Sequence, residues 1–319
     1  MSDARLRMAA SQCGVDTASF VPVEFAFGDA ARDGSTGWIF ITEQHDRALG
    51  PALLWAQKQQ VQVVNILSEK SAGVLVRRAS LFSHQINVWS VLDGKVVVAD
   101  AEEVLGEAIV SEAHEKFAAM IAESGAEVVR EHGVLSGEVM GLEVCRVIDD
   151  NGEARLEIGV GVHDRETFQL LHGKEATLQS LRNVVEIVGK HRAEGAEHHP
   201  LNRLGAERLL RHRIVSSPQL VGLTTAYTTE PPVKRMNVKD AVPCVAVGKN
   251  DLGDEVVVVC TASVDVDVVA FAADARLRIS PKAKLLIATH VNNVVPALQK
   301  LADSLVEPAA FTEVAPVRR

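Results

Sequence analysis

Short apolar runs alternate with helical patterns between Gly37 and Val91, and this alternation constrains the fold more than any other feature of the sequence. The runs have the length and the β-branched content of buried strands, whereas the segments between them place apolar residues at helical spacing. Strands that alternate with helices are typical of βαβ units with a parallel sheet. We therefore expect strands at 37–42, 61–69 and 86–91, helices at 48–60 and 71–82, and an edge strand after the Asp93-Gly94 turn.

The C-terminal third repeats part of this plan. A strand at 284–290, a helix at 293–306 and a strand in AAFTEV follow the same order as residues 61–91, which leaves an internal duplication open. The valine-rich runs before them predict further strands, and an Ala- and Glu-rich helical pattern covers 102–130. The predicted fold class is α/β, with βαβ units in mixed sheets, a central antiparallel hairpin and a second α/β region at the C-terminus. A long irregular stretch at 216–240 suggests a boundary, so the expected regions are 1–105, 106–215 and 216–319.

Composition excludes several classes of function. Hydrophobic residues make up 47% of the chain and charged residues 24%, as in an ordinary globular protein. The net charge of −9 argues against a general binder of nucleic acid or anionic membranes. No run of 18 apolar residues predicts a transmembrane helix, and the N-terminal segment lacks the apolar core of a secretory signal. The four cysteines are scattered without a CxxC pair, which together with these features predicts reduced thiols and a cytoplasmic location.

A central hairpin, residues 134–163, is marked by the turn signal Asn151-Gly152. Its register matters because a slip of one residue moves every side chain to the other face. A two-residue loop places Arg146 opposite Glu157 and mixes polar and apolar side chains on both faces. A three-residue loop places Glu143 opposite Gly159 and separates the two kinds of side chain much better, so we expect this register.

The expected register brings Glu143 and Glu157 together on one face, with Gly141, Gly159 and Gly161 around them. Two close carboxylates raise one pKa or recruit a cation. Together with the polar residues at the end of the second strand, the two glutamates predict a group of catalytic residues and a group of ligands for Mg²⁺ or Mn²⁺. The catalytic candidates are Glu143, Glu157 and His163, and the metal-ligand candidates are Glu143, Glu157 and Asp164. The alternative is a solvated hairpin face whose glycines let a helix pack closely.

The hairpin resembles the catalytic hairpin of the PD-(D/E)XK nuclease-like superfamily, with Glu143 in place of the first acid and Glu157 in place of the second. This resemblance implies a metal-dependent phosphodiesterase. The family's lysine, two residues after the second acid, is replaced by Gly159, so its cation would come from elsewhere, such as Arg165. The resemblance therefore supports a degenerate or non-catalytic relative at least as well as an active enzyme.

Two further groups of charged residues are candidates. Asp265 and Asp267 lie two apart in an expected strand, where they would share a face and hold a metal that carries a phosphate, or simply face solvent. A basic segment predicts contacts with phosphates of a nucleic acid or with an acidic partner through Arg203, Arg208 and Arg211. The simpler interpretation of that segment is a solvated helix with ion pairs along its own surface.

These observations support three functions. The leading hypothesis is a cytosolic, non-catalytic protein that binds a ligand or partner, and the sequence is compatible with a homo-oligomer. The alternative is a metal-dependent hydrolase at the Glu143–Glu157 hairpin. A small-molecule enzyme of another type is the third, although the chain contains no GxGxxG, phosphate-binding loop or GxSxG motif.

Overall fold

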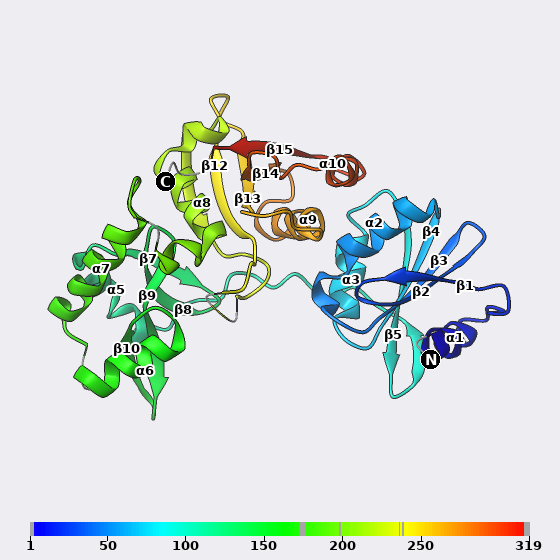
Figure 1. Cartoon of the computed structure of the whole chain (residues 1–319), viewed down its shortest axis with the longest axis horizontal. Helices are drawn as coiled ribbons and strands as arrows, with labels where there is room; N and C mark the ends of the chain where they lie inside the picture. Colours follow the sequence, from blue (N-terminus) through cyan, green and yellow to red (C-terminus); the bar gives the residue numbers. More distant parts are fainter. Residues whose placement is uncertain (1–2, 173–175, 198, 236, 238, 316–319) are drawn as a thin grey trace. The chain divides into compact units, whose positions relative to one another are not determined.

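The computed structural model describes residues 3–172, 176–197, 199–235, 237 and 239–315. Helices combine with sheets of parallel and antiparallel strands, so the fold class is α/β as predicted (Figure 1). The chain forms two compact units. The first consists of Met1–Leu105, Val264–Pro281 and Val294–Phe311, and the second of Gly106–Ser263, Lys282–Asn293 and Thr312–Arg319.

The first unit contains a six-stranded sheet with the strand order β1-β2-β3-β4-β5-β6. Its three central strands are parallel and confirm the predicted βαβ pattern, with β6 as the antiparallel edge strand. The strands are β1 (Val21–Phe25), β2 (Gly28–Asp33), β3 (Thr36–Ile41), β4 (Val63–Ser68), β5 (Gln85–Leu92) and β6 (Lys95–Val98). The helices at the predicted places are α2 (Leu49–Gln59) and α3 (Ala72–Ala79).

Helix α1 (Asp3–Gln12) and strands β1 and β2 were not predicted, because their sequences have no strong hydrophobic period. They are held by tertiary packing. Leu6 of α1 is fully buried in a cluster with Ala31 of β2, Trp38 and Phe40 of β3 and Leu67 of β4. Burial against the sheet thus stabilises elements whose own propensity is weak.

The second unit contains a four-stranded antiparallel sheet with the order β10-β9-β8-β7. The strands are β7 (Glu127–Glu131), β8 (Val134–Val139), β9 (Leu142–Asp150) and β10 (Glu153–Ile158). Two-residue turns join them, and both residues of each turn have positive φ, at His132-Gly133, Met140-Gly141 and Asn151-Gly152. Such turns match the twist of paired strands, which explains why Asn-Gly was a reliable signal.

The predicted register of the central hairpin was wrong. Asn151 and Gly152 form the whole loop, Asp150 pairs with Glu153, and Arg146 lies opposite Glu157. Side-chain polarity favoured the wrong register because β9 is not a regular strand but contains a bulge. The second strand also ends earlier than expected, at Ile158, and helix α6 (Gly161–His172) begins three residues before Asp164.

The remaining helices of the second unit are α4 (Glu112–Glu115), α5 (Ala118–Glu123), α7 (Leu178–Arg192) and α8 (Ala206–Ser216). The predicted helix over 102–130 was therefore wrong over most of its length, since residues 101–111 are irregular and β7 follows α5. Helices α5 and α7 cover the apolar face of the sheet. Ile121 and Leu181 from these helices pack in one core with Leu142, Cys145 and Leu156 of the sheet.

A third sheet has the order β11-β12-β13-β14-β15, with its first two pairs antiparallel and the next parallel. Its strands are β11 (Thr225–Thr229), β12 (Cys244–Lys249), β13 (Glu255–Cys260), β14 (Lys284–His290) and β15 (Ala309–Val314). Helix α9 (Val268–Ile279) follows β13 and α10 (Pro296–Asp303) follows β14. Strands β11–β14 with α9 repeat the order of β1–β4 with α2, since in both the first two pairs are antiparallel and the third is parallel.

One expectation for this region differs from the structure. Asp265 and Asp267 do not lie on a strand, because β13 ends at Cys260 and Asp267 directly precedes α9. Chain segments on both sides of the expected boundary at 215/216 belong to the second compact unit. Among the described residues, no helix has the length and hydrophobicity needed to cross a membrane.

Candidate functional site

A bulge in β9 gives the four-stranded sheet one strongly charged face. Gly137 pairs with Cys145 but Glu138 pairs with Glu143, so Val144 is an extra residue on β9. An extra residue reverses the alternation of side chains along a strand. Glu143 therefore lies on the same face as Arg146, whereas Cys145 points into the core.

Glu143 and Glu157 do come together on this face, and the cations between them are guanidinium groups. Arg165 of α6 places Nη1 3.0 Å from Glu143 Oε1 and Nε 3.4 Å from Glu157 Oε2. Arg146 approaches Glu143 to 2.8 Å, and Arg155 approaches Glu157 to 3.0 Å. Arg165, which the sequence suggested as a replacement for the cation missing at Gly159, thus contacts both acids.

The other predicted members of the catalytic and metal sets lie apart from this pair. The side chain of His163 is fully exposed and lies 3.5 Å from Glu166 on its own helix. Asp164 accepts a hydrogen bond of 2.6 Å from the backbone N–H of Val160, at the start of α6. Among the described residues, no group of three or more His, Cys, Asp or Glu side chains is placed to hold a metal ion.

The glycines beside the acids allow helices to pack closely. A Cβ on Gly141 would lie 2.3 Å from the backbone carbon of Arg208 in α8, and one on Gly159 would lie 2.8 Å from the backbone N of Arg165 in α6. Both glycines also have positive φ, at 76° and 137°. At these two positions the structure agrees with the close-packing interpretation, which was the alternative to an open site.

Arg208 and Arg211 were predicted to contact a partner, but both are buried, with 8% and 2% of their surface exposed. Each guanidinium binds both Glu131 of β7 and Glu138 of β8. Burial alone would raise the pKa of Glu131, but the guanidinium groups of Arg211 and Arg208 outweigh it and lower the pKa to about 2. These two arginines therefore fasten α8 to the sheet. Arg203 is exposed at the end of a short 3₁₀ helix, Pro200–Arg203.

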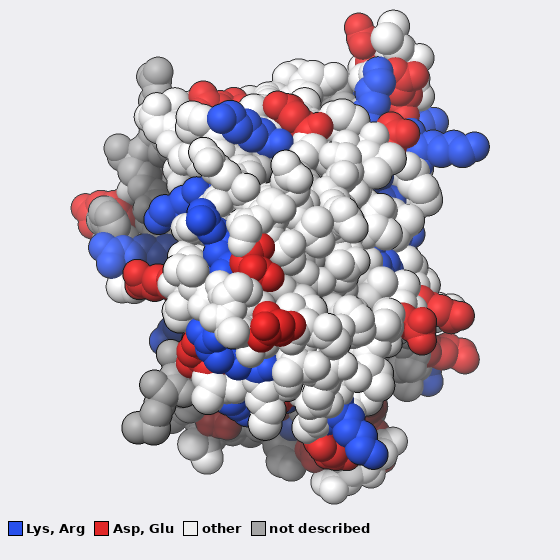
Figure 2. Space-filling model, turned by 90° about the vertical axis from the view of Figure 1, so that its right-hand side faces the viewer, with Lys and Arg blue, Asp and Glu red and all other residues white. Residues whose placement is uncertain are grey.

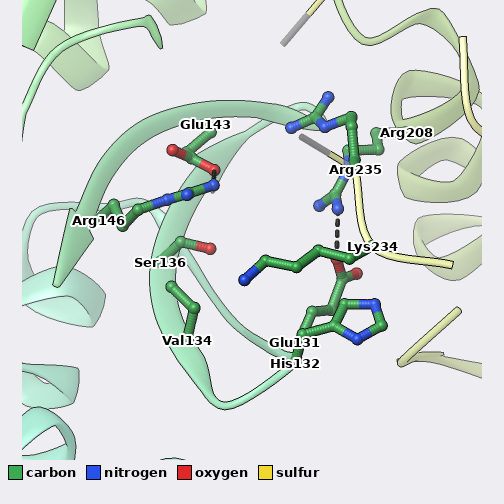
Figure 3. A pocket seen from close by; sticks show the side chains of 9 residues that line it. All are labelled: Glu131, His132, Val134, Ser136, Glu143, Arg146, Arg208, Lys234 and Arg235. Atoms are coloured by element: carbon green, nitrogen blue, oxygen red, sulfur yellow. Dashed lines mark hydrogen bonds and ion pairs between the residues drawn. The ribbon is translucent and has the colours of Figure 1, made fainter. Parts of the chain in front are cut away.

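Next to this buried cluster, the charged face opens into two adjoining cavities that we call the cleft. The inner cavity is small, with about 30 Å³ available to the centres of water-sized groups. Lys234 and Arg235 approach it from the segment after β11, opposite Glu143, Arg146 and Ser136 of the sheet (Figure 3). The other residues that line it are Glu131, His132, Val134 and Arg208.

The outer cavity measures about 640 Å³ and shares Glu143, Arg146 and Arg235 with the inner one. The rest of its lining consists of apolar residues, two further cations, one acid, one amide and a histidine. These residues are Val160, Gly161, Val162, Leu204, Arg165, Lys239, Asp164 and Asn237, together with His163. Its volume is within the range of small-molecule sites, roughly 300–1,000 Å³.

Lys234 and Arg235 differ from the other cations of the charged face. Within the part of the chain that the structure describes, neither side chain has a hydrogen-bond or ion-pair partner. Burial, together with the neighbouring charge of Arg208, lowers the pKa of Arg235. The surroundings of Arg235 thus disfavour its positive charge, and a bound anion would reverse this effect. The face in Figure 2, by contrast, carries charges of both signs interspersed among uncharged residues.

Comparison with protein-family models, with curated proteins and with solved structures gave no match. Lys234 and Arg235 were not predicted, because they follow β11 in a segment without helix or strand, where no period shows which way a side chain points. The available signal was an adjacent Lys-Arg pair, directly after Pro231, Pro232 and Val233, in a chain of net charge −9.

Proposed function

We propose that this protein is a non-catalytic binding protein whose cleft takes a small anionic molecule. The observation that carries the proposal is the pair Lys234 and Arg235, two cations without an acidic partner among the described residues, opposite Arg146. Lys and Arg without protein partners at a concave surface suit an anion, because charge-assisted hydrogen bonds are the strongest that these groups make. The chain as a whole is acidic, so this positive surplus is local.

Binding has more support than catalysis because the candidate acids are already engaged. Glu143 contacts two guanidinium groups, from Arg146 and Arg165, and Glu157 contacts those of Arg155 and Arg165. A carboxylate held in this way is a poor general base and a poor metal ligand, since either role requires it to give up a buried partner. The metal-dependent hydrolase remains the second hypothesis, with the Glu143–Glu157 pair as its only support.

The experiment is a thermal-shift titration of the full chain with sodium phosphate, sodium acetate, MgCl₂ and MnCl₂. Three proteins are compared: wild type, the double variant Lys234→Gln/Arg235→Gln, and the control Lys95→Gln at the exposed start of β6. We expect at least one anion to raise the Tm of the wild type and the control by several degrees more than that of the double variant. Equal anion shifts in all three proteins would refute the proposal. A Mn²⁺ shift that disappears in Glu143→Gln would favour the hydrolase.

A further inference from the structure

We infer that the ligand of the cleft is a phosphate monoester, with its phosphate in the inner cavity and its less polar body in the outer cavity. This inference rests on the proposed function and names the ligand class of the same site. It follows from three features of the cleft, namely its charge, its donors and its division into two compartments.

The charge of the inner cavity favours a dianion. Two acids, Glu131 and Glu143, line it together with four bases, Arg146, Arg208, Lys234 and Arg235, which leaves two positive charges. A phosphate monoester carries about −1.5 to −2 charges at pH 7. A carboxylate or a phosphodiester carries only one, so it would leave a cation unpaired in a partly buried place.

The inner cavity also offers unused donors. The Nε of Arg146 is buried and has no hydrogen-bond partner among the described groups. The hydroxyl of Ser136, a residue only 6% exposed, is turned toward the space that the Lys234 amino group also approaches (Figure 3). Buried donors without partners cost free energy, and the several oxygens of a phosphate are acceptors that could meet them together. The small size of this compartment admits one compact group only.

The outer cavity explains why the ligand has a body as well as a phosphate. It shares Glu143, Arg146 and Arg235 with the inner cavity, and it adds the apolar side chains of Val160, Val162 and Leu204. Apolar surface of this kind contributes affinity only when a ligand covers it. Inorganic phosphate would fill the inner compartment and leave this surface exposed to water.

Isothermal titration calorimetry with four probes separates these ligand classes. Phenyl phosphate, benzenesulfonate and benzoate share one body and differ in the anionic group, and inorganic phosphate lacks the body. We expect phenyl phosphate to bind at least tenfold more tightly than each of the other three. Its affinity should also fall below pH 6, where the phosphate dianion takes up one proton and becomes a monoanion, while any affinity for benzenesulfonate should not follow that step.

Variants then locate the probe. Lys234→Gln and Arg235→Gln should each weaken phenyl phosphate binding about tenfold or more, as expected for the loss of a charged donor. Val162→Ser should weaken phenyl phosphate and leave inorganic phosphate unchanged, because Val162 lines only the outer cavity. Lys95→Gln should change neither.

The outcomes distinguish this inference from the proposed function. Tighter binding of benzoate or benzenesulfonate than of phenyl phosphate, with loss in Arg235→Gln, would overturn the phosphate inference and support an anion site. Inorganic phosphate that binds as tightly as phenyl phosphate would overturn the role of the outer cavity. No binding of any probe, or binding that Lys234→Gln and Arg235→Gln leave unchanged, would overturn both.

Discussion

Each compact unit contains a cluster of buried arginines and acids, and the two clusters are built differently. In the first unit, the guanidinium of Arg78 lies 3.4 Å from Asp267 and 2.9 Å from Asp274. Arg77 also binds Asp274, at 2.8 Å. In the second unit, Arg208 and Arg211 each contact both Glu131 and Glu138. In the first cluster, one acid therefore has more and closer guanidinium partners than the other. In the second cluster, each acid has two.

The pKa values of the acids show what this difference means. Burial raises the pKa of Asp267 to about 7, because Arg78 and the backbone N–H of Gly50 offset it only in part. Glu131 is buried as well, yet two guanidinium groups lower its pKa to about 2. The number and closeness of the partners, rather than burial alone, decide whether a buried acid is charged. The same balance applies to the cleft, where Arg208 and Arg211 bind Glu131 and Glu138, and none of the described acids forms an ion pair with Arg235.

Removal of one acid from the well-paired cluster should have the largest effect. We expect Glu138→Gln to lower the free energy of unfolding of the second unit by about 3–5 kcal/mol, because it leaves buried guanidinium charge without its partner. Cys145, Cys244 and Cys260 are buried and all lie in this unit, so their labelling in urea reports its unfolding. A loss below about 1 kcal/mol would mean that the cluster is solvated.

The first unit should lose stability as the pH rises. The folded-state pKa of Asp267 lies above its usual value of 3.8, so the folded unit retains a proton that the unfolded chain releases. Stability should therefore fall between about pH 4 and pH 7, by on the order of 4 kcal/mol. All three tryptophans lie in this unit, so their fluorescence in urea measures the effect. Asp267→Asn keeps an acceptor for Gly50 and should remove this slope. An unchanged slope would place the titration elsewhere.

The second unit should show the opposite dependence. Because the pKa of Glu131 is lowered from 4.5 to about 2, its ionised form stabilises the fold above pH 4.5. We expect that contribution, about 3 kcal/mol, to disappear as the pH falls from 4.5 toward 2. Thiol labelling at a fixed pH, after equilibration in urea at each test pH, follows it. Glu131→Gln is the comparison, and a wild type that loses no more stability in acid than this variant would contradict the prediction.

The smallest effect on stability should come from the cleft. Lys234→Gln should change the free energy of unfolding by less than about 0.5 kcal/mol, since its side chain is exposed and has no partner among the described residues. Urea unfolding without added anion measures this. A large loss of unfolding free energy would show that Lys234 stabilises the fold as Arg211 does. It would contradict the distinction between cations with and without an acidic partner.

Much of the fold could be predicted because local patterns carry it. The βαβ alternation located β3, β4 and β5 with their helices, and the turn signals located β6 and the central hairpin. The sequence also indicated that Glu143 and Glu157 share a face. The register that led to this expectation was wrong. The two acids nevertheless share a face, because the bulge at Val144 moves the side chain of Glu143 to the face that carries Glu157. A bulge without a glycine leaves no mark in a hydrophobic pattern.

The sequence by itself determined the fold class, the place of the hairpin and the acids that the hairpin carries, because strand period and turn chemistry act over a few residues. Only the tertiary structure decided which partners those charges find. Glu131 and Arg211 are 80 positions apart, and Arg165 reaches Glu143 across 22. The packing of α6, α8 and the segment after β11 against one sheet decides which acids form ion pairs. It also decides which cations face the cleft without an acidic partner among the described residues. A pattern read along the chain contains no measure of that packing.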